Sequence, residues 1–312
     1  MMPTFCSLRM QGGHSIGRGS SAVKILNTLT FRVTRTLLGA FHYMERIKTF
    51  PGVLLALETA TRSGSIAVLR EGTIVASKSG SAEQSHGERL PIDIIELLAT
   101  LDLTVKDVER YAVAVGPGSF TGLRVGISTI QGLSLVQSVP IVGVSTLASL
   151  AEGVRDAELV GAWLDGQRHQ VFSAGYLRLK ESKSSTSNRA MNGGLSKIIT
   201  VPHGFSEIEP HSVGTPGEMS SCWQKRIEKT ALTLVGDGAE RYESEVKHCL
   251  GSTVRVLPIQ GNLAESVGRL AIRASDYQLS APHALRPLYV RRPDVELTRD
   301  LVHSSEGKTI GS

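Results

Sequence analysis

A glycine-rich run at 116–124 limits the local fold of this chain more than any other stretch. Its sequence is Gly-Pro-Gly-Ser-Phe-Thr-Gly-Leu-Arg, between an apolar segment at 111–115 and a segment rich in small residues at 123–136. Glycine has no Cβ and tolerates positive φ, so the run predicts a sharp turn from a strand into a helix. Ser119 or Thr121 would cap that helix by accepting a hydrogen bond from a first-turn amide.

The run is compatible with two roles. A strand, a glycine loop and a helix N-terminus together can form a cradle for an anion. The alternative is a tight connection without a ligand. A Walker A loop is excluded, because neither Lys-Ser nor Lys-Thr follows the last glycine. The candidate nucleotide contacts are Gly116, Pro117, Gly118, Ser119, Phe120, Thr121, Gly122 and Arg124.

The segments around the run predict an α/β lobe over residues 53–152. A buried strand with a polar turn is expected at 53–61, and strands at 65–69 and 73–77 complete an antiparallel meander. Apolar residues then recur at helical intervals over 88–101, and a strand at 140–144 leads into a helix at 145–152. With the glycine loop included, the order β-β-β-α-β-α-β-α is that of a ribonuclease-H-like lobe.

A second lobe is expected over residues 158–295. Strands at 160–165 and 170–176 would form a hairpin around a charged turn, and 232–235 is a further strand that enters a glycine turn. An amphipathic helix is expected at 263–277, a flexible insertion near 180–197 and a polar tail at 296–312. In each lobe a strand is followed by a glycine turn and then by a helix. This repeated pattern predicts a duplicated, actin-like (ASKHA) fold.

Residues 1–50 differ from the rest of the chain. No Asp or Glu precedes Glu45, while arginines are spread among serines and glycines. Such a segment is typical of an organellar transit peptide. The alternatives are a disordered extension, or an over-long gene model with its true start at Met44. We expect an extension outside the folded domain.

Bulk composition predicts a soluble, cytoplasmic protein, with an organelle as the alternative because of residues 1–50. The formal charge of +5 permits contact with nucleic acid without arguing for it. Cys6, Cys222 and Cys249 are widely separated and show no metal or redox spacing. No apolar run approaches the length of a membrane span.

The two helices expected at 88–101 and 123–136 carry an excess of apolar and small residues. In the first, Asp93, Glu96 and Asp102 form the main polar face. The remaining surface must cover the sheet of the same chain or face another protein. The candidate interface residues are Leu90, Ile94, Ile95, Leu97, Leu98, Ile127, Ile130, Leu133 and Ser134.

The glycine-rich run resembles the signature of the bacterial TsaB (YeaZ) family. Segments at 57–61, 85–90, 142–147, 165–172, 235–239 and 287–293 resemble further motifs of that family in the same order, over about residues 53–298. The family's first strand usually ends in Asp, where this chain has Glu58.

The resemblance implies an actin-like fold and a non-catalytic subunit for threonylcarbamoyladenosine synthesis on tRNA. The implied partners are a TsaD-like catalytic subunit, paired through first-lobe helices, and a TsaE-like ATPase. It implies indirect contact with tRNA, no membrane, and homodimerisation when alone. No cofactor of its own is implied, but ATP or ADP is a candidate ligand of the complex.

The resemblance also directs attention to histidine, because the catalytic paralogue TsaD holds a metal through His-x-x-x-His. Residues four apart lie on one helix face and can share an ion. No two of the nine histidines here are four apart. We therefore expect no metal site, and for His86 a solvated or helix-capping role.

Two enzymatic alternatives stay open. One is a metal-dependent carbamoyltransferase or metallopeptidase, and the other is an ATP-dependent phosphotransferase. In the second, Glu58 or Asp165 would hold Mg²⁺ or activate a nucleophile, although both can equally end strands and bind turn amides. Arg168, Arg291 and Arg292 are candidate contacts to tRNA phosphates, or simply solvated arginines.

Overall fold

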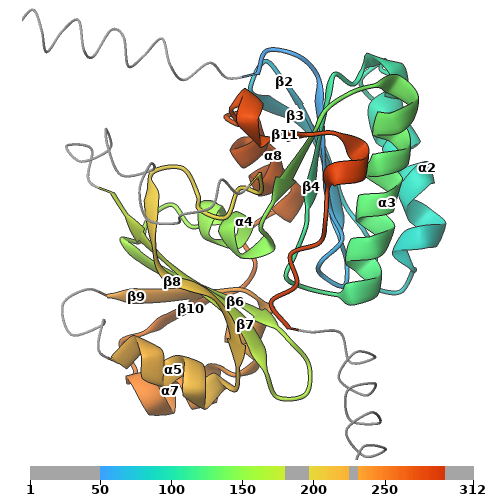
Figure 1. Ribbon diagram of the computed structural model, residues 1–312. Coiled ribbons are helices and arrows are strands. Elements are labelled where there is room, and N and C mark those ends of the chain that lie inside the picture. Colours follow the sequence, from blue (N-terminus) through green and yellow to red (C-terminus); the bar gives the residue numbers. More distant parts are fainter. Residues whose placement is uncertain (1–49, 180–196, 225–230, 292–312) are drawn as a thin grey trace, which may run out of the picture. The chain divides into compact units, whose positions relative to one another are not determined.

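The computed structural model describes residues 50–179, 197–224 and 231–291, and Figure 1 shows its elements. The expected extension at 1–50 (except Phe50), almost all of the insertion at 180–197, and the tail at 296–312 lie outside the described residues. In the part of the chain that the structure describes, no helix combines the length and apolar character needed to cross a membrane.

The first lobe is built on a six-stranded sheet in the order β11-β5-β4-β1-β2-β3. Its strands are β1 (Leu54–Glu58), β2 (Ser65–Arg70), β3 (Thr73–Ser79), β4 (Arg110–Ala114), β5 (Ile141–Val144) and β11 (Leu279–Ser280). Its helices are α2 (His86–Ala99), α3 (Phe120–Gln137) and α4 (Thr146–Gly153). Strands β1 to β3 are antiparallel, and β1, β4 and β5 are parallel. The predicted β-β-β-α-β-α-β-α order is confirmed.

The second lobe repeats this plan in a five-stranded sheet ordered β10-β9-β6-β7-β8. Its strands are β6 (Leu159–Asp165), β7 (Val171–Arg178), β8 (Phe205–Gly214), β9 (Leu232–Val235) and β10 (Arg255–Leu257). Its helices are α5 (Pro216–Gln224), α6 (Asp237–Arg241), α7 (Glu243–Leu250) and α8 (Leu263–Ala271). β6 takes the position of β1, and β9 that of β4. The two lobes therefore have one topology, and the actin-like fold is confirmed.

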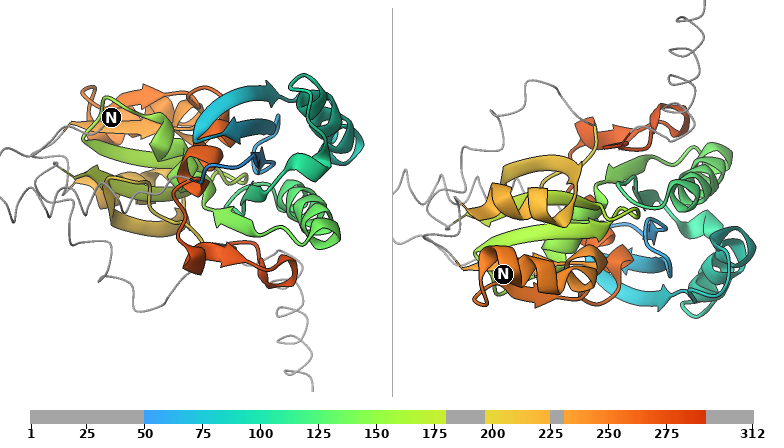
Figure 2. Two further views of the ribbon diagram at one scale, coloured as in Figure 1. Left: turned by 90° about the horizontal axis from the view of Figure 1, so that it is seen from above. Right: turned by 90° about the horizontal axis from the view of Figure 1, so that it is seen from below.

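The first sheet is apolar on both faces. Leu55 and Leu57 of β1 pack with α2 and α3, whereas Leu54 and Ala56 pack into a core that includes α4, α8 and the second sheet. This explains why β1 reads as a continuous apolar run rather than as an alternating one. Figures 1 and 2 show α2 and α3 together on one face of the first sheet.

The last helix of each lobe packs on the sheet of the other lobe. Helix α4 contacts β6 and β7, and α8 contacts every strand from β1 to β5. Gly268 of α8 lies so close to Leu69 that a Cβ would collide with it, and the Ala264 amide donates to Ser65 Oγ over 3.0 Å. Because α4 and α8 each pack on the sheet of the other lobe, residues of both lobes belong to one hydrophobic core.

Two elements within the predicted second lobe at 158–295 contact the first sheet. Helix α8 belongs to the second repeat by order but covers the first sheet, and β11 pairs with β5 at the edge of that sheet. The helix expected at 263–277 ends at Ala271, and a short 3₁₀ turn, η4 (Asp276–Gln278), follows. A strand of two residues leaves no periodic signal, so β11 could not be predicted.

Neighbouring isoleucines on α2 allow a test of which face is structural. Ile94 is 2% exposed and Ile95 is 61% exposed. We expect Ile94→Ala to lower the free energy of unfolding by about 2–5 kcal/mol, because it leaves a cavity in the core. Ile95→Ala should change it by less than about 0.5 kcal/mol. Urea unfolding of the two variants measures both values, and equal effects would contradict the packing described here.

Candidate functional site

The glycine loop connects β4 to α3 as predicted. Gly116 and Gly118 have φ values of 112° and 153°, and the Gly116–Pro117 peptide bond is cis. Ser119 is the residue that caps α3, since its Oγ accepts the Gly122 amide over 3.2 Å. Because of this cap, α3 begins at Phe120, three residues before the predicted start.

The glycines allow α3 to pack tightly on the turn that follows β1. A Cβ on Gly122 would collide with the Thr59 carbonyl, and one on Gly126 with Thr59 Oγ1. A Cβ on Gly118 would lie 2.6 Å from that of Ala60, whose carbonyl accepts the Ser119 amide. Close packing thus explains why glycine, and no larger residue, fits at positions 118, 122 and 126. Nucleotide contact at the loop stays a prediction.

The buried carboxylate of Glu58 accepts hydrogen bonds from the same turn. The Thr61 amide donates to Oε1 over 2.6 Å, and the hydroxyl groups of Thr61 and Ser65 donate to Oε2. Burial raises the pKa of Glu58 above its ordinary value, although the hydrogen bonds from Thr61 oppose that shift. Of the two roles considered for Glu58, the geometry agrees with the binding of turn amides.

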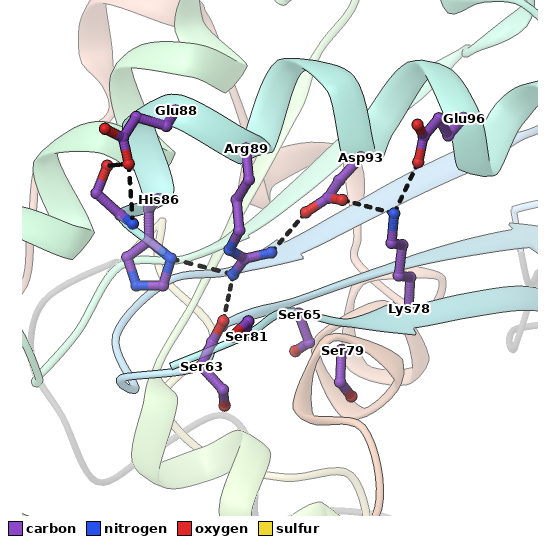
Figure 3. A network of polar contacts seen from close by, with 12 residues as sticks. Ser63, Ser65, Lys78, Ser79, Ser81, His86, Glu88, Arg89, Asp93 and Glu96 are labelled. Carbon is purple, nitrogen blue, oxygen red and sulfur yellow. Dashed lines mark hydrogen bonds and ion pairs between the residues drawn. The ribbon is translucent and has the colours of Figure 1, made fainter. Parts of the chain in front are cut away.

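His86 and Arg89 connect α2 to this turn, in the network shown in Figure 3. His86 Nε2 lies 3.1 Å from the Thr61 carbonyl, and His86 Nδ1 lies 3.2 Å from the Arg89 guanidinium. Nε2 therefore carries the proton and Nδ1 accepts, which requires a neutral ring. Burial lowers the pKa of His86, in agreement with that state. The expected solvated or capping role was wrong, because the His86 ring hydrogen-bonds both to the Thr61 carbonyl and to Arg89.

Asp93 is buried, although the sequence placed it on the polar face of its helix. Its carboxylate binds Arg89 Nη1 and Lys78 Nζ, each over 2.6 Å, and Arg89 also donates to the Ser63 carbonyl. Burial alone would raise the pKa of Asp93, but hydrogen bonds from Lys78 and Arg89 outweigh it, so the pKa is lowered. The Arg-x-x-x-Asp spacing on an apolar helix was the available signal for this pair.

A segment near the C-terminal end of the described chain lies along α3. We call residues 282–291 the strap. The side-chain amide of Gln131 donates to the carbonyls of Pro282 and Leu285, and the Leu288 amide donates to the Val115 carbonyl over 2.7 Å. Tyr289 packs on Phe120 with ring centroids 5.6 Å apart. The strap thus borders the glycine loop.

The end of the strap reaches the β6–β7 hairpin of the second lobe. Arg291 Nη1 donates to the Gly166 carbonyl over 2.9 Å and to Gln170 Oε1 over 3.0 Å. Two motifs about 120 residues apart are thereby in contact. Arg291 is therefore engaged within the chain rather than simply solvated, and Arg292 lies outside the described residues.

The turn of that hairpin has an unusual backbone. Gln167, Arg168 and His169 have consecutive φ values of 60°, 54° and 56°, a region costly for residues other than glycine. Asp165 accepts the Gln167 amide over 3.1 Å and binds Arg241 over 2.6 Å. The geometry of Asp165 therefore agrees with the second role considered for it, which was to end a strand and bind a turn amide.

The candidate interface residues are mostly inside the chain. Side chains of Leu90, Ile94, Leu97, Leu98, Ile127, Ile130 and Ser134 are buried, and that of Leu133 is half-buried. Ile95 is the exposed member of the set. The two helices also expose Ile92, Leu135 and Val136, which were not among the candidates, and Phe120 of the glycine loop. The buried side chains cover the sheet.

Another polar cluster was not predicted. Ser145 Oγ lies 2.7 Å from His211 Nε2, and His211 Nδ1 lies 3.1 Å from Glu207 Oε1. Ser145 is fully buried at the N-terminus of α4, where its Oγ also accepts the Ala148 amide. This cluster connects α4 to β8. Among the described residues, no three His, Cys, Asp or Glu side chains gather as metal ligands would.

Two glycines of α3 test the close packing on the turn after β1. We expect Gly126→Ala to lower the free energy of unfolding by about 1–3 kcal/mol, because its Cβ would overlap Thr59 Oγ1. Gly132→Ala is the matched control, since nothing lies within 4 Å of its added Cβ. It should raise stability by about 0.5–1 kcal/mol through helix propensity. Chemical denaturation compares them, and equal stability of the two variants would refute the packing argument.

Comparison with known proteins finds similarity to proteins named for threonylcarbamoyladenosine synthesis. The family model of TsaD, tRNA N6-adenosine threonylcarbamoyltransferase, matches residues 73–202. The tRNA threonylcarbamoyladenosine biosynthesis protein TsaB of Escherichia coli is 36% identical over 128 residues, which is 40% of this chain and 55% of that protein. The Bacillus subtilis TsaB is 33% identical over 124 residues, 39% of this chain and 54% of that protein. The matches thus span about half the length of these relatives.

A solved structure supports the fold over a longer stretch. YeaZ from Pseudomonas aeruginosa superposes with a TM-score of 0.58 at 24% identity, over 76% of this chain and 99% of that chain. At this identity the likeness concerns the fold alone. The chain is thus similar in sequence to TsaB proteins and to the TsaD family over part of its length, and similar in fold to YeaZ.

Proposed function

We propose that the chain is a non-catalytic subunit that binds a TsaD-like threonylcarbamoyltransferase and supports threonylcarbamoyladenosine synthesis on tRNA. The names of relatives 33–36% identical support this role. The TsaD family match over residues 73–202 supports descent from a common ancestor with the catalytic subunit.

The observation that carries the proposal is the apolar outer face of α2 and α3. Ile92 and Ile95 of α2 are 58% and 61% exposed, and Leu135 and Val136 of α3 are 70% and 87% exposed. The two helices are in contact, so these side chains belong to one helical layer. Exposed large apolar side chains on neighbouring helices favour a protein interface, and burying them on binding supplies affinity.

The state of the polar groups favours a supporting role over a catalytic one. Glu58 is occupied by the turn after β1, Asp165 by the hairpin turn and Arg241, and His86 by Thr61 and Arg89. A catalytic base or metal ligand needs a free position for substrate or ion. These groups instead hold turns and helices in place.

The proposed complex also includes a nucleotide, a second protein partner and tRNA. ATP or ADP is bound by the complex, a TsaE-like ATPase joins it, and tRNA is held mainly by the catalytic subunit. When the catalytic subunit is missing, a second copy of this chain covers the same face of α2 and α3. The chain acts in the cytoplasm, or in an organelle if residues 1–50 direct import.

The interface is tested by Ile95→Asp. A charge at the centre of an apolar contact should weaken binding to a TsaD-like subunit more than tenfold, since each such burial contributes about 1.5–3 kcal/mol. Co-purification and titration calorimetry with the tagged subunit measure this. Tyr277→Asp, at a residue 42% exposed outside α2 and α3, is the control and should bind normally. Normal binding by Ile95→Asp, with the fold intact, would remove this interface from the proposal.

The non-catalytic role is tested on the lone chain. Titration with ATP and Mg²⁺, followed by a phosphate-release assay, should show no turnover above the buffer rate. The Glu58→Gln variant is the matched control, and its phosphate release should equal that of the parent protein. Tight binding with turnover that Glu58→Gln abolishes would instead favour the phosphotransferase alternative.

A further inference from the structure

An exposed aromatic and cationic stack lies beside the glycine loop. The Arg124 guanidinium lies 4.0 Å from the centroid of the Phe120 ring, and Phe120 packs on Tyr289 of the strap at a tilt of 31°. Phe120 is 39% exposed and Tyr289 is 42% exposed, although both are large aromatic residues. The stack therefore offers ring surface to a ligand outside the chain.

The chain segments that meet around the stack are basic. These are the turn after β1 (59–65), the glycine loop (116–124) and the strap (282–291). They contain four arginines, Arg62, Arg124, Arg286 and Arg291, and no Asp or Glu. Arg62, Arg124 and Arg286 are exposed and form no ion pair with any carboxylate of the described residues. The positive charge is thus available to an anionic partner.

We propose that this face binds single-stranded RNA, with an unpaired base stacked on Tyr289 and Phe120 and with phosphates against Arg62, Arg124 and Arg286. Aromatic rings bind the π-faces of bases without regard to sequence, and neighbouring arginines bind the backbone. Unpaired bases are the part of RNA that can reach such a stack, because bases in a duplex are covered by their neighbours. The ligand is therefore a loop or an end rather than a helix.

Charge favours RNA over a protein partner at this face. Arg62, Arg124 and Arg286 have no carboxylate partner among the described residues, so a polyanion gains more from this face than an uncharged protein surface would. The apolar face of α2 and α3 has the opposite character and is the surface assigned to the protein partner. The two surfaces differ in chemistry, so one subunit can bind both.

The hairpin turn of the second lobe contacts the end of the strap. The strap holds this turn through Arg291, and the turn keeps Gln167, Arg168 and His169 in the left-handed region. Such conformations are costly for residues other than glycine and persist where the surrounding structure imposes them, commonly at binding sites. The turn carries the exposed Arg168.

This inference rests on the proposed function, because that function brings tRNA to the chain. It adds direct contact with unpaired nucleotides by the supporting subunit itself. The test uses the lone full-length chain and no catalytic subunit, so its failure would leave the partner interface of α2 and α3 untouched. Failure of Ile95→Asp to weaken partner binding would likewise leave the RNA result standing.

The experiment measures fluorescence anisotropy of a labelled single-stranded RNA and of a duplex with the same sequence. Tyr289→Leu and Phe120→Leu should each weaken binding of the single strand about tenfold and leave duplex binding unchanged, since stacking needs unpaired bases. Arg124→Gln should lower the slope of log affinity against log salt by about 0.7, the value for one phosphate contact on a single strand. The basic residues 1–50 contribute equally to all variants.

Matched controls are Tyr277→Leu, at a tyrosine that is also 42% exposed, and Arg70→Gln at the far end of β2. Both should bind RNA as the parent chain does. Thermal unfolding checks the fold, and the exposed Arg124→Gln remains decisive if an aromatic variant does not fold. The proposal is wrong if all three site variants bind the single strand normally, or if single strand and duplex lose affinity alike. Normal RNA binding with lost binding to a TsaD-like subunit would assign the stack to protein contact.

Discussion

The close contact between the start of α3 and the turn after β1 organises the first lobe. Glycines 118, 122 and 126 permit it, and Thr59 and Ala60 are the residues they approach. Because the Ser119 amide also binds the Ala60 carbonyl, the direction of α3 is set by β1 as well as by β4. The strap then packs on the same end of α3. The glycine loop is thus a packing device, whether or not it also contacts a nucleotide.

Order and type of the first-lobe elements could be predicted from apolar periodicity, turn residues and the Ser119 cap. Elements with weak or mixed patterns could not. Strand β8 is half-buried along most of its length and contains Pro210, so it shows neither alternation nor a continuous apolar run. Burial of Arg89 and Asp93 was also not predicted, because their i,i+4 spacing indicates a pair but does not show that the pair faces the protein interior.

The candidate site was predictable in part. Motif resemblance identified the glycine loop, the hairpin turn and the segment at 287–293, but not that Arg291 connects the last two. Candidate interface residues were chosen by apolarity alone, and apolarity first selects residues for the core. Exposed Ile92 and Ile95 differ from buried Ile94 only in their position around the helix. That distinction requires knowledge of which face meets the sheet.

The exchange of α4 and α8 between the sheets has a consequence for synthesis on the ribosome. One face of β1 and β2 is covered by α8, which follows them by about 200 residues in the chain. Until α8 emerges, the apolar side chains of that face lack part of their cover, so the first lobe cannot complete its core before residues 263–271 have been made. Contacts this distant in sequence slow folding. A nascent chain of this architecture therefore exposes apolar surface for longer than a protein with two self-contained lobes would.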